Sequence, residues 1–135
     1  MSTNAGFSSD FLSLPFLGEL SPGQHLDKEK IITQINIPNY LHVSHNCFVL
    51  RMSGTKMQDS GIFHNDLLII EPSSTAKNGA IVIATIDNLE TVIKHFEQTN
   101  DLIILSCKSP DIKPMIFDPS RIKIAGILVS QMRSY

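Results

Sequence analysis

Hydrophobic residues after residue 30 fall into short runs that are rich in Ile, Val, Leu and Phe and are bounded by turn-forming residues. This pattern is typical of β-strands, because β-branched and aromatic side chains suit a pleated, half-buried surface. We expect strands at residues 31–37, 47–52, 67–71, 80–87, 90–96, 102–106 and 122–132. The sequence therefore predicts a mostly β fold.

Polar and glycine residues between these runs predict how the strands connect. The Asp-Asn pair at 87–88 predicts a tight hairpin. The segment 77–79 predicts another turn, in which Gly79 is free to take a positive φ. A short helical turn is expected to begin near Lys56 and to end at Gly61.

The first part of the chain, residues 1–30, does not follow the strand pattern, because glycine, proline and serine interrupt it. Leu14, Phe16 and Leu17 give this segment apolar side chains that can dock on a protein surface. We expect a flexible N-terminal arm at 1–30 and a β domain at 31–135. The arm has no room for the two packed helices of a helix-turn-helix, so we do not expect a DNA-binding repressor from this chain on its own.

Composition narrows the class of protein further. Of 135 residues, 42% are hydrophobic, which is enough for one domain with a core. The net charge of −2 gives no electrostatic reason to bind nucleic acid directly. No apolar run reaches the ~18 residues of a membrane span, and the N-terminus lacks the basic start of a signal peptide. We expect a cytoplasmic protein in which Cys47 and Cys107 are reduced, although a disulfide between them stays open.

The most informative motif lies at residues 48–70. It reads Phe-Val-Leu-Arg-Met-Ser-Gly-Thr-Lys-Met from Phe48, followed by Gly61-Ile62 and then by Asp-Leu-Leu-Ile-Ile. Further fragments lie in order at residues 14–20, 78–84, 90–92 and 124–129. Through their order and spacing these segments resemble the LexA/UmuD family of self-cleaving SOS-response proteins (peptidase S24). The resemblance implies a LexA/signal-peptidase-like β-rich domain of UmuD-like length.

The resemblance also implies a chemistry, and the residues that carry it have changed in this chain. In the family, the second serine of Ser-Gly-x-Ser-Met attacks a peptide bond; here that position is Lys56. The family's base is a neutral lysine directly after Thr-Val, where this chain has Ile93. We therefore expect a pseudo-peptidase rather than an enzyme, with no cofactor and no catalytic residue. Lys56 and Ile93 are interpreted as vestigial catalytic positions.

The bond that would be cut has changed as well. The family cleaves an Ala-Gly or Cys-Gly bond in its own arm, whereas Pro22 precedes Gly23 here. Proline fixes its own φ and has no N–H to pair with the edge of a cleft. Pro22 and Gly23 are interpreted as a vestigial cleavage site.

The sequence also leaves open a catalytic site that is built from other residues. Lys94 follows Ile93 and is expected on the opposite face of the strand, but a β-bulge would turn it inward. Ser53 and Thr55 are hydroxyls near the vestigial site, although Thr55 is expected to face elsewhere. The alternative function is therefore a self-cleaving S24 serine peptidase with an unorthodox site.

One cluster has spacing that suits zinc. It consists of His42, His45 and Cys47, but no fourth ligand lies nearby in the sequence, so we expect no metal site.

The run at 122–132 is long and apolar. As an uncovered edge it would pair with another chain; the alternative is that it is buried within the monomer. The resemblance implies a two-fold dimer through this region, either a homodimer or a heterodimer with an active relative. It further implies a role in the SOS response by protein binding, with RecA filament, a Y-family translesion polymerase or a related repressor as partners. A mobile-element antirepressor is a further alternative.

Overall fold

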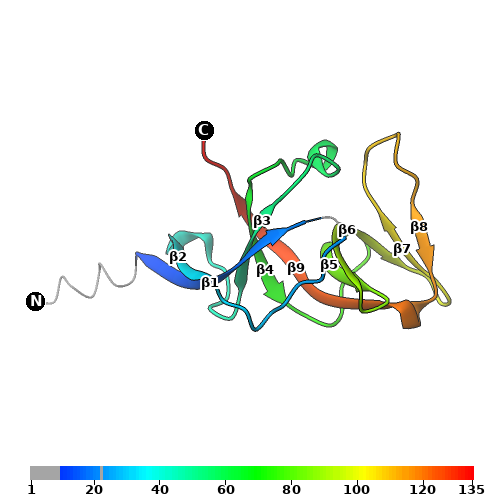
Figure 1. The fold of residues 1–135 in the computed structure, drawn as a ribbon, viewed down its shortest axis with the longest axis horizontal. Helices are drawn as coiled ribbons and strands as arrows, with labels where there is room; N and C mark the ends of the chain where they lie inside the picture. The colour runs from blue at the N-terminus through cyan, green and yellow to red at the C-terminus, as the bar shows by residue number, and fades with distance from the viewer. Residues whose placement is uncertain (1–9, 22) are drawn as a thin grey trace, which may run out of the picture.

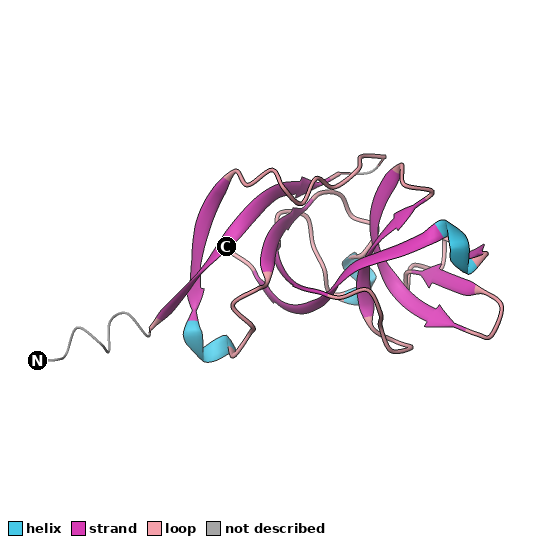
Figure 2. Cartoon of the chain, turned by 90° about the horizontal axis from the view of Figure 1, so that it is seen from below, coloured by secondary structure: helices cyan, strands magenta, loops and turns pink. Residues whose placement is uncertain are grey.

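A computed structural model describes residues 10–21 and 23–135 of the chain. Its elements are β1 (Phe11–Leu20), β2 (Thr33–Pro38), η1 (Asn39–Leu41), β3 (Phe48–Met52), η2 (Gln58–Ser60), β4 (Leu67–Pro72), β5 (Ile81–Ile86), β6 (Glu90–Gln98), β7 (Ile103–Ser106), β8 (Met115–Phe117), η3 (Pro119–Arg121) and β9 (Ile122–Met132). The strands form one sheet in the order β2-β1-β3-β4-β9-β5-β6-β7-β8. The mostly β fold is confirmed, and the 3-10 turns η1 to η3 add little to the body of the molecule (Figure 2). In the described residues, no helix is long and apolar enough to cross a membrane.

The segment that we expected to be a flexible arm contributes a strand. Residues Phe11–Leu20 form β1, which pairs antiparallel with β2 and parallel with β3. Leu14 and Phe16 are buried, so this part of the segment belongs to the core of the domain. Pro15 and Gly18 made the segment look irregular, but the sheet accommodates them, because the β1–β3 register shifts between Phe16 and Glu19.

The other strand predictions agree with β2 to β7 and β9 within a few residues, while β8 was missed because it is only three residues long. The predicted hairpin is present, with Asp87 and Asn88 at φ values of 54° and 57°. The ladder pairs Ile86 with Glu90, so the connection also includes Leu89. The predicted turn at Gly79 is present too, with φ at 93°.

Strand β9 joins two halves of the sheet. It pairs with β5 along Ile122–Ile127 and with β4 along 126–132 (Figure 1). Of the two alternatives for β9, an uncovered edge or burial within the monomer, the structure favours the second, since β9 lies inside the sheet. Among the described residues, the part of β9 beyond Ile127 lacks a partner on the β5 side. One core cluster lies within each half, and a third, which includes Leu50 and Ile93, lies between the halves.

Gly126 sits where β9 passes from one ladder to the other. A Cβ at this residue would lie 2.5 Å from Ile70 Cγ2 and 2.7 Å from the carbonyl oxygen of Glu71. The β5 ladder shifts register beside this point, between Ile83 and Ala84, and the β4 ladder shifts further along β9, where Ile69 pairs with Ser130 and Ile70 with Leu128. Because one of the obstacles is backbone, a larger residue would have to displace β4.

We predict that Gly126→Ala lowers the free energy of unfolding by about 1–3 kcal/mol, the usual cost of overpacking a filled interior. Urea denaturation followed by circular dichroism would measure it. Ser130→Ala, on the same strand and without added atoms, serves as the control and should change stability by less than ~0.5 kcal/mol. Equal stability of Gly126→Ala and the parent protein would contradict the close approach of β9 to β4.

Candidate functional site

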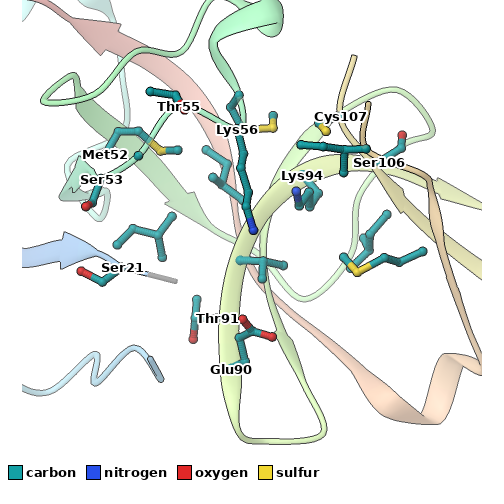
Figure 3. Close-up of a pocket in the computed structure, with 18 of the residues that line it drawn as sticks. Ser21, Met52, Ser53, Thr55, Lys56, Glu90, Thr91, Lys94, Ser106 and Cys107 are labelled. Atoms are coloured by element: carbon teal, nitrogen blue, oxygen red, sulfur yellow. The ribbon is translucent and has the colours of Figure 1, made fainter. Parts of the chain in front are cut away.

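A cavity of about 520 Å³ lies between the two halves, beside the start of β6. Its apolar lining comes from Leu20, Met52, Met57, Val92, Ile93, Leu105, Ile112 and Met115. Its polar lining comes from Ser21, Ser53, Thr55, Lys56, Glu90, Thr91, Lys94, Ser106, Cys107 and Lys113. The residues of the resembling motif and those of β6 therefore meet around one space, as the sequence interpretation requires (Figure 3).

Lys56 is held at this cavity by the loop that follows β3. Gly54, with φ at 98°, turns the chain, and its N–H donates to His64 Nδ1 at 2.9 Å. Met57 is only 1% exposed and anchors the loop in the core. Lys56 itself is exposed and lines the cavity, extending toward the first residues of β6 in the view of Figure 3. The expected helical turn is shorter than predicted, since η2 begins at Gln58.

A buried ion pair fixes the far end of the same loop. Asp66 is fully buried and accepts hydrogen bonds from the Phe63 N–H at 2.8 Å and from Arg133 Nε at 2.7 Å. Arg133 also donates to the carbonyl oxygen of Gly61 at 3.1 Å. Its guanidinium holds the pKa of the Asp66 carboxyl below the usual range. Arg133, which follows β9, thus holds the loop that carries Lys56 in place.

Strand β6 presents two successive buried residues to the cavity. Ile93 pairs with Ile83 and packs in the core cluster between the halves, whereas Lys94 pairs with Val82 and shares the opposite face with Phe96. The predicted alternation is therefore present. However, Lys94 is not turned away from the site, because both faces of β6 border the cavity at this point.

Lys94 reaches the cavity without a bulge. The β5–β6 ladder has no register shift, yet Lys94 is only 7% exposed and lines the same space as Lys56. In the view of Figure 3 it lies between Lys56 and Ser106. The alternative arrangement that we considered required a bulge; the structure brings Lys94 to the cavity by the curvature of the sheet.

The structure places more hydroxyl-bearing residues around the cavity than the sequence analysis identified. Ser53 and Thr55 both line the cavity. Ser106 on β7, which the sequence did not single out, lines it from the other side. The cavity therefore combines amines and hydroxyls, although not at the positions where the family pattern has them.

The segment that begins at Gly23 docks on its own chain. The Gly23 N–H donates to Glu90 Oε2 at 3.1 Å, and the Leu26 N–H donates to Thr91 Oγ1 at 2.8 Å. The Thr91 N–H in turn donates to the carbonyl oxygen of Gln24 at 2.8 Å. The sequence placed Glu90 and Thr91 in a fragment of the family resemblance. It did not indicate that they bind this segment, because nothing in their spacing points to a partner so far away in the chain. Pro22 lies outside the described residues.

His95 ties the Lys56 loop to β6 on the side of β6 that carries Ile93. Its Nε2 lies 2.8 Å from Ser60 Oγ. Burial and the charge of Lys108 lower the pKa of His95, whereas a backbone hydrogen bond with Gly79 opposes this change. A neutral ring with fixed partners is consistent with a structural link between the loop and the strand.

The candidate zinc ligands do not converge. Cys47 is buried, whereas His42 and His45 are exposed. Burial and the nearby Glu71 raise the pKa of the Cys47 thiol, which disfavours the thiolate that binds metal. Across residues 10–21 and 23–135, no group of three or more His, Cys, Asp or Glu is arranged to hold a metal ion. Cys47 and Cys107 are both free in the structure.

Comparison with known proteins decides the family. The family model described as peptidase S24-like matches residues 15–129. The chain belongs to the peptidase S24-like family. It is similar to the LexA repressor of Pelagibacter ubique, with 31% identity over 125 residues, which are 92% of this chain and 56% of the relative.

Two further relatives give the same picture. The LexA repressor of Clostridium novyi is 35% identical over 128 residues, which are 93% of this chain and 62% of the relative. That of Clostridioides difficile is 29% identical over 130 residues, which are 96% of this chain and 62% of the relative. This S24-like chain therefore spans about 56–62% of the length of these relatives. The resemblance inferred from the motifs is confirmed at the level of the family.

We predict that Arg133→Ala lowers the free energy of unfolding by about 1–3 kcal/mol, because it leaves a buried carboxylate without its strongest partner. The control is Arg121→Ala, which removes an ion pair with Asp87 whose side chains are 49% and 39% exposed. Its cost should stay below ~1 kcal/mol. Chemical denaturation at neutral pH would compare the two, and equal losses would contradict a special role of the buried pair.

The difference in the free energy of unfolding between the parent protein and Arg133→Ala depends on pH in a defined direction. The pKa of Asp66 is lowered on folding from the ordinary value of 3.8, so the stabilisation is fully present above that value. It is lost as the pH falls through the lowered pKa of the folded state. The difference between the parent protein and Arg133→Ala should therefore narrow under acidic conditions and remain constant from pH ~6 upward.

Proposed function

We propose that this chain is a non-cleaving UmuD/LexA-like protein of the SOS response, which acts in the cytoplasm by dimerisation and protein binding. The observation that supports the proposal is Lys56, an amine at the cavity where the family pattern has a serine. An amine that attacked a peptide carbonyl would form a stable amide rather than an ester that water can hydrolyse. Losing a catalytic nucleophile typically lowers a rate by several orders of magnitude, because the catalytic groups act as a unit.

The docked segment supports a protein that keeps its N-terminal part. Gly23 and Leu26 are held by the first two residues of β6, and Ser21 lines the cavity. A segment tied down in this way and left uncut would cover one end of the cavity permanently. In this proposal the surface around β1 and the docked segment belongs to the form that partners recognise.

The proposed partners follow from the family. A homodimer, or a heterodimer with an active relative, would modulate a Y-family translesion polymerase or a related repressor, with RecA filament as a further partner. The relatives named LexA repressor support the link to the SOS response, whereas the net charge of −2 favours no direct contact with nucleic acid. A mobile-element antirepressor would use the same mixed dimers.

A second function is favoured by one observation. Lys94 is buried at the cavity, and Ser53, Thr55 and Ser106 line the same space. A lysine and a hydroxyl are the two components of a serine peptidase of this family. A self-cleaving S24 peptidase with an unorthodox site is therefore the alternative, and the mass of the intact chain distinguishes the two.

We predict that the chain keeps its full mass after incubation with RecA, nucleotide and single-stranded DNA, and equally at alkaline pH, because no hydroxyl stands at position 56. Mass spectrometry of the intact protein would measure this. A product cut between Pro22 and Gly23 would defeat the proposal and support the alternative. The Lys56→Ser variant restores a hydroxyl at position 56. If this variant cleaves itself and the double variant with Lys94→Met does not, then the residue at position 56 alone prevents cleavage in the parent chain.

We further predict a concentration-dependent dimer through the part of β9 beyond Ile127, which has no partner on the β5 side and exposes 43% of Val129. Val129→Lys should shift the sedimentation coefficient toward the monomer, because two like charges would face each other across a two-fold interface. Leu89→Lys, at the 73% exposed tip of the β5–β6 hairpin, is the control and should leave the dimer intact. A parent protein that sediments as a monomer at every concentration would contradict this prediction.

A further inference from the structure

Lys94 is an unusual lysine, because it is buried and lacks a partner. It is only 7% exposed, and no residue within 10–21 and 23–135 forms a hydrogen bond or an ion pair with its amine. The stem of the side chain is what is buried; the amine itself opens onto the cavity, since none of the buried side-chain nitrogens and oxygens of the described residues lacks a hydrogen-bond partner. The amine lines the cavity, so the open space in front of it is where a compensating group would lie.

The charges around the cavity favour an anion as that group. Lys56, Lys94 and Lys113 line it, and the acidic side chain among the lining residues is Glu90. Glu90 is at the other end, where it already accepts the hydrogen bond from Gly23. The described part of the lining thus carries an excess of positive charge.

Three apolar residues form part of the wall next to Lys94, beside Ser106 and Cys107. Leu105 at the end of β7, and Ile112 and Met115 around the β7–β8 connection, line this side of the cavity. Leu105 is fully buried, and Ile112 and Met115 are partly buried. A ligand that fits here combines one negative charge with a hydrocarbon body, since small-molecule sites pair apolar walls with a few placed polar groups.

We propose that the part of the cavity between β6 and the β7–β8 connection binds an aliphatic carboxylate, whose charged end pairs with Lys94 and whose chain lies against Leu105, Ile112 and Met115. The volume of about 520 Å³ is within the range of small-molecule sites. A phosphate is a poorer fit, because phosphate sites usually supply the planar fork of arginine or a cluster of backbone N–H groups, and the lining contains no arginine. This function goes beyond dimerisation.

Calorimetric titration of the full chain with sodium octanoate tests the proposal, with octanol as the neutral analogue of the same shape. Octanoate is expected to bind at least about tenfold more tightly than octanol, because only the carboxylate can form an ion pair with the amine of Lys94. Equal affinity of the two, or no binding of octanoate, would overturn the proposal.

Lys94→Met removes the charge and keeps an unbranched side chain that is one atom shorter. We expect this variant to lose about tenfold or more of the octanoate affinity and to retain octanol binding, which also reports that the cavity is intact. Lys77→Met, at an exposed lysine outside the cavity, is the matched control and should bind octanoate like the parent chain. If Lys94→Met bound octanoate as tightly as the parent chain, Lys94 would not be the partner of the carboxylate and the proposal would be overturned.

A measurement on the unaltered chain covers the case in which Lys94→Met does not fold. Brief acetylation with and without octanoate, followed by peptide mass spectrometry, compares the labelling of individual lysines. Octanoate should protect Lys94 several-fold and leave the exposed Lys77 and Lys108 unchanged. Equal labelling of Lys94 in both samples would show that the ligand binds elsewhere or not at all, and would overturn the proposal.

Discussion

The passage of β9 between β4 and β5 is the constraint on which the rest of the structure depends. One strand supplies hydrogen bonds to both halves of the sheet, and Gly126 allows it to approach Ile70 and Glu71 more closely than any side chain would permit. The core cluster between the halves forms because β9 holds them together, and the cavity lies beside that cluster. Arg133, just beyond the end of β9, extends the same connection to the loop that carries Lys56.

The loop that carries Lys56 shows how a framework can hold its shape independently of one side chain. The loop after β3 keeps a well-defined conformation, since Gly54, Met57 and Asp66 anchor it independently of the side chain at position 56. A lysine therefore replaces a hydroxyl there without disturbing the fold. The result is a cavity with several amines and one acid, in which charge rather than nucleophilicity is the dominant property.

Much of the fold was predictable from particular segments. The apolar runs from β2 to β7 and in β9 alternate with turn residues, and such local signals survive in the tertiary structure. Strand β1 was not predictable in the same way, because Pro15 and Gly18 signal irregularity locally, and only pairing with β2 and β3 makes the segment a strand. For the site, position 56 was located by its motif, whereas Glu90, Thr91 and Arg133 act on residues distant in the sequence.

The sequence by itself determined the family, the β character and the absence of a serine at position 56, because each is carried by residue identity and local spacing. Tertiary structure decided whether Lys94 faces the cavity. Alternation along β6 separates Lys94 from Ile93, but the curvature of the sheet exposes both faces of the strand to one space. Curvature arises from the packing of all the strands together, so a pattern read along one strand does not contain it.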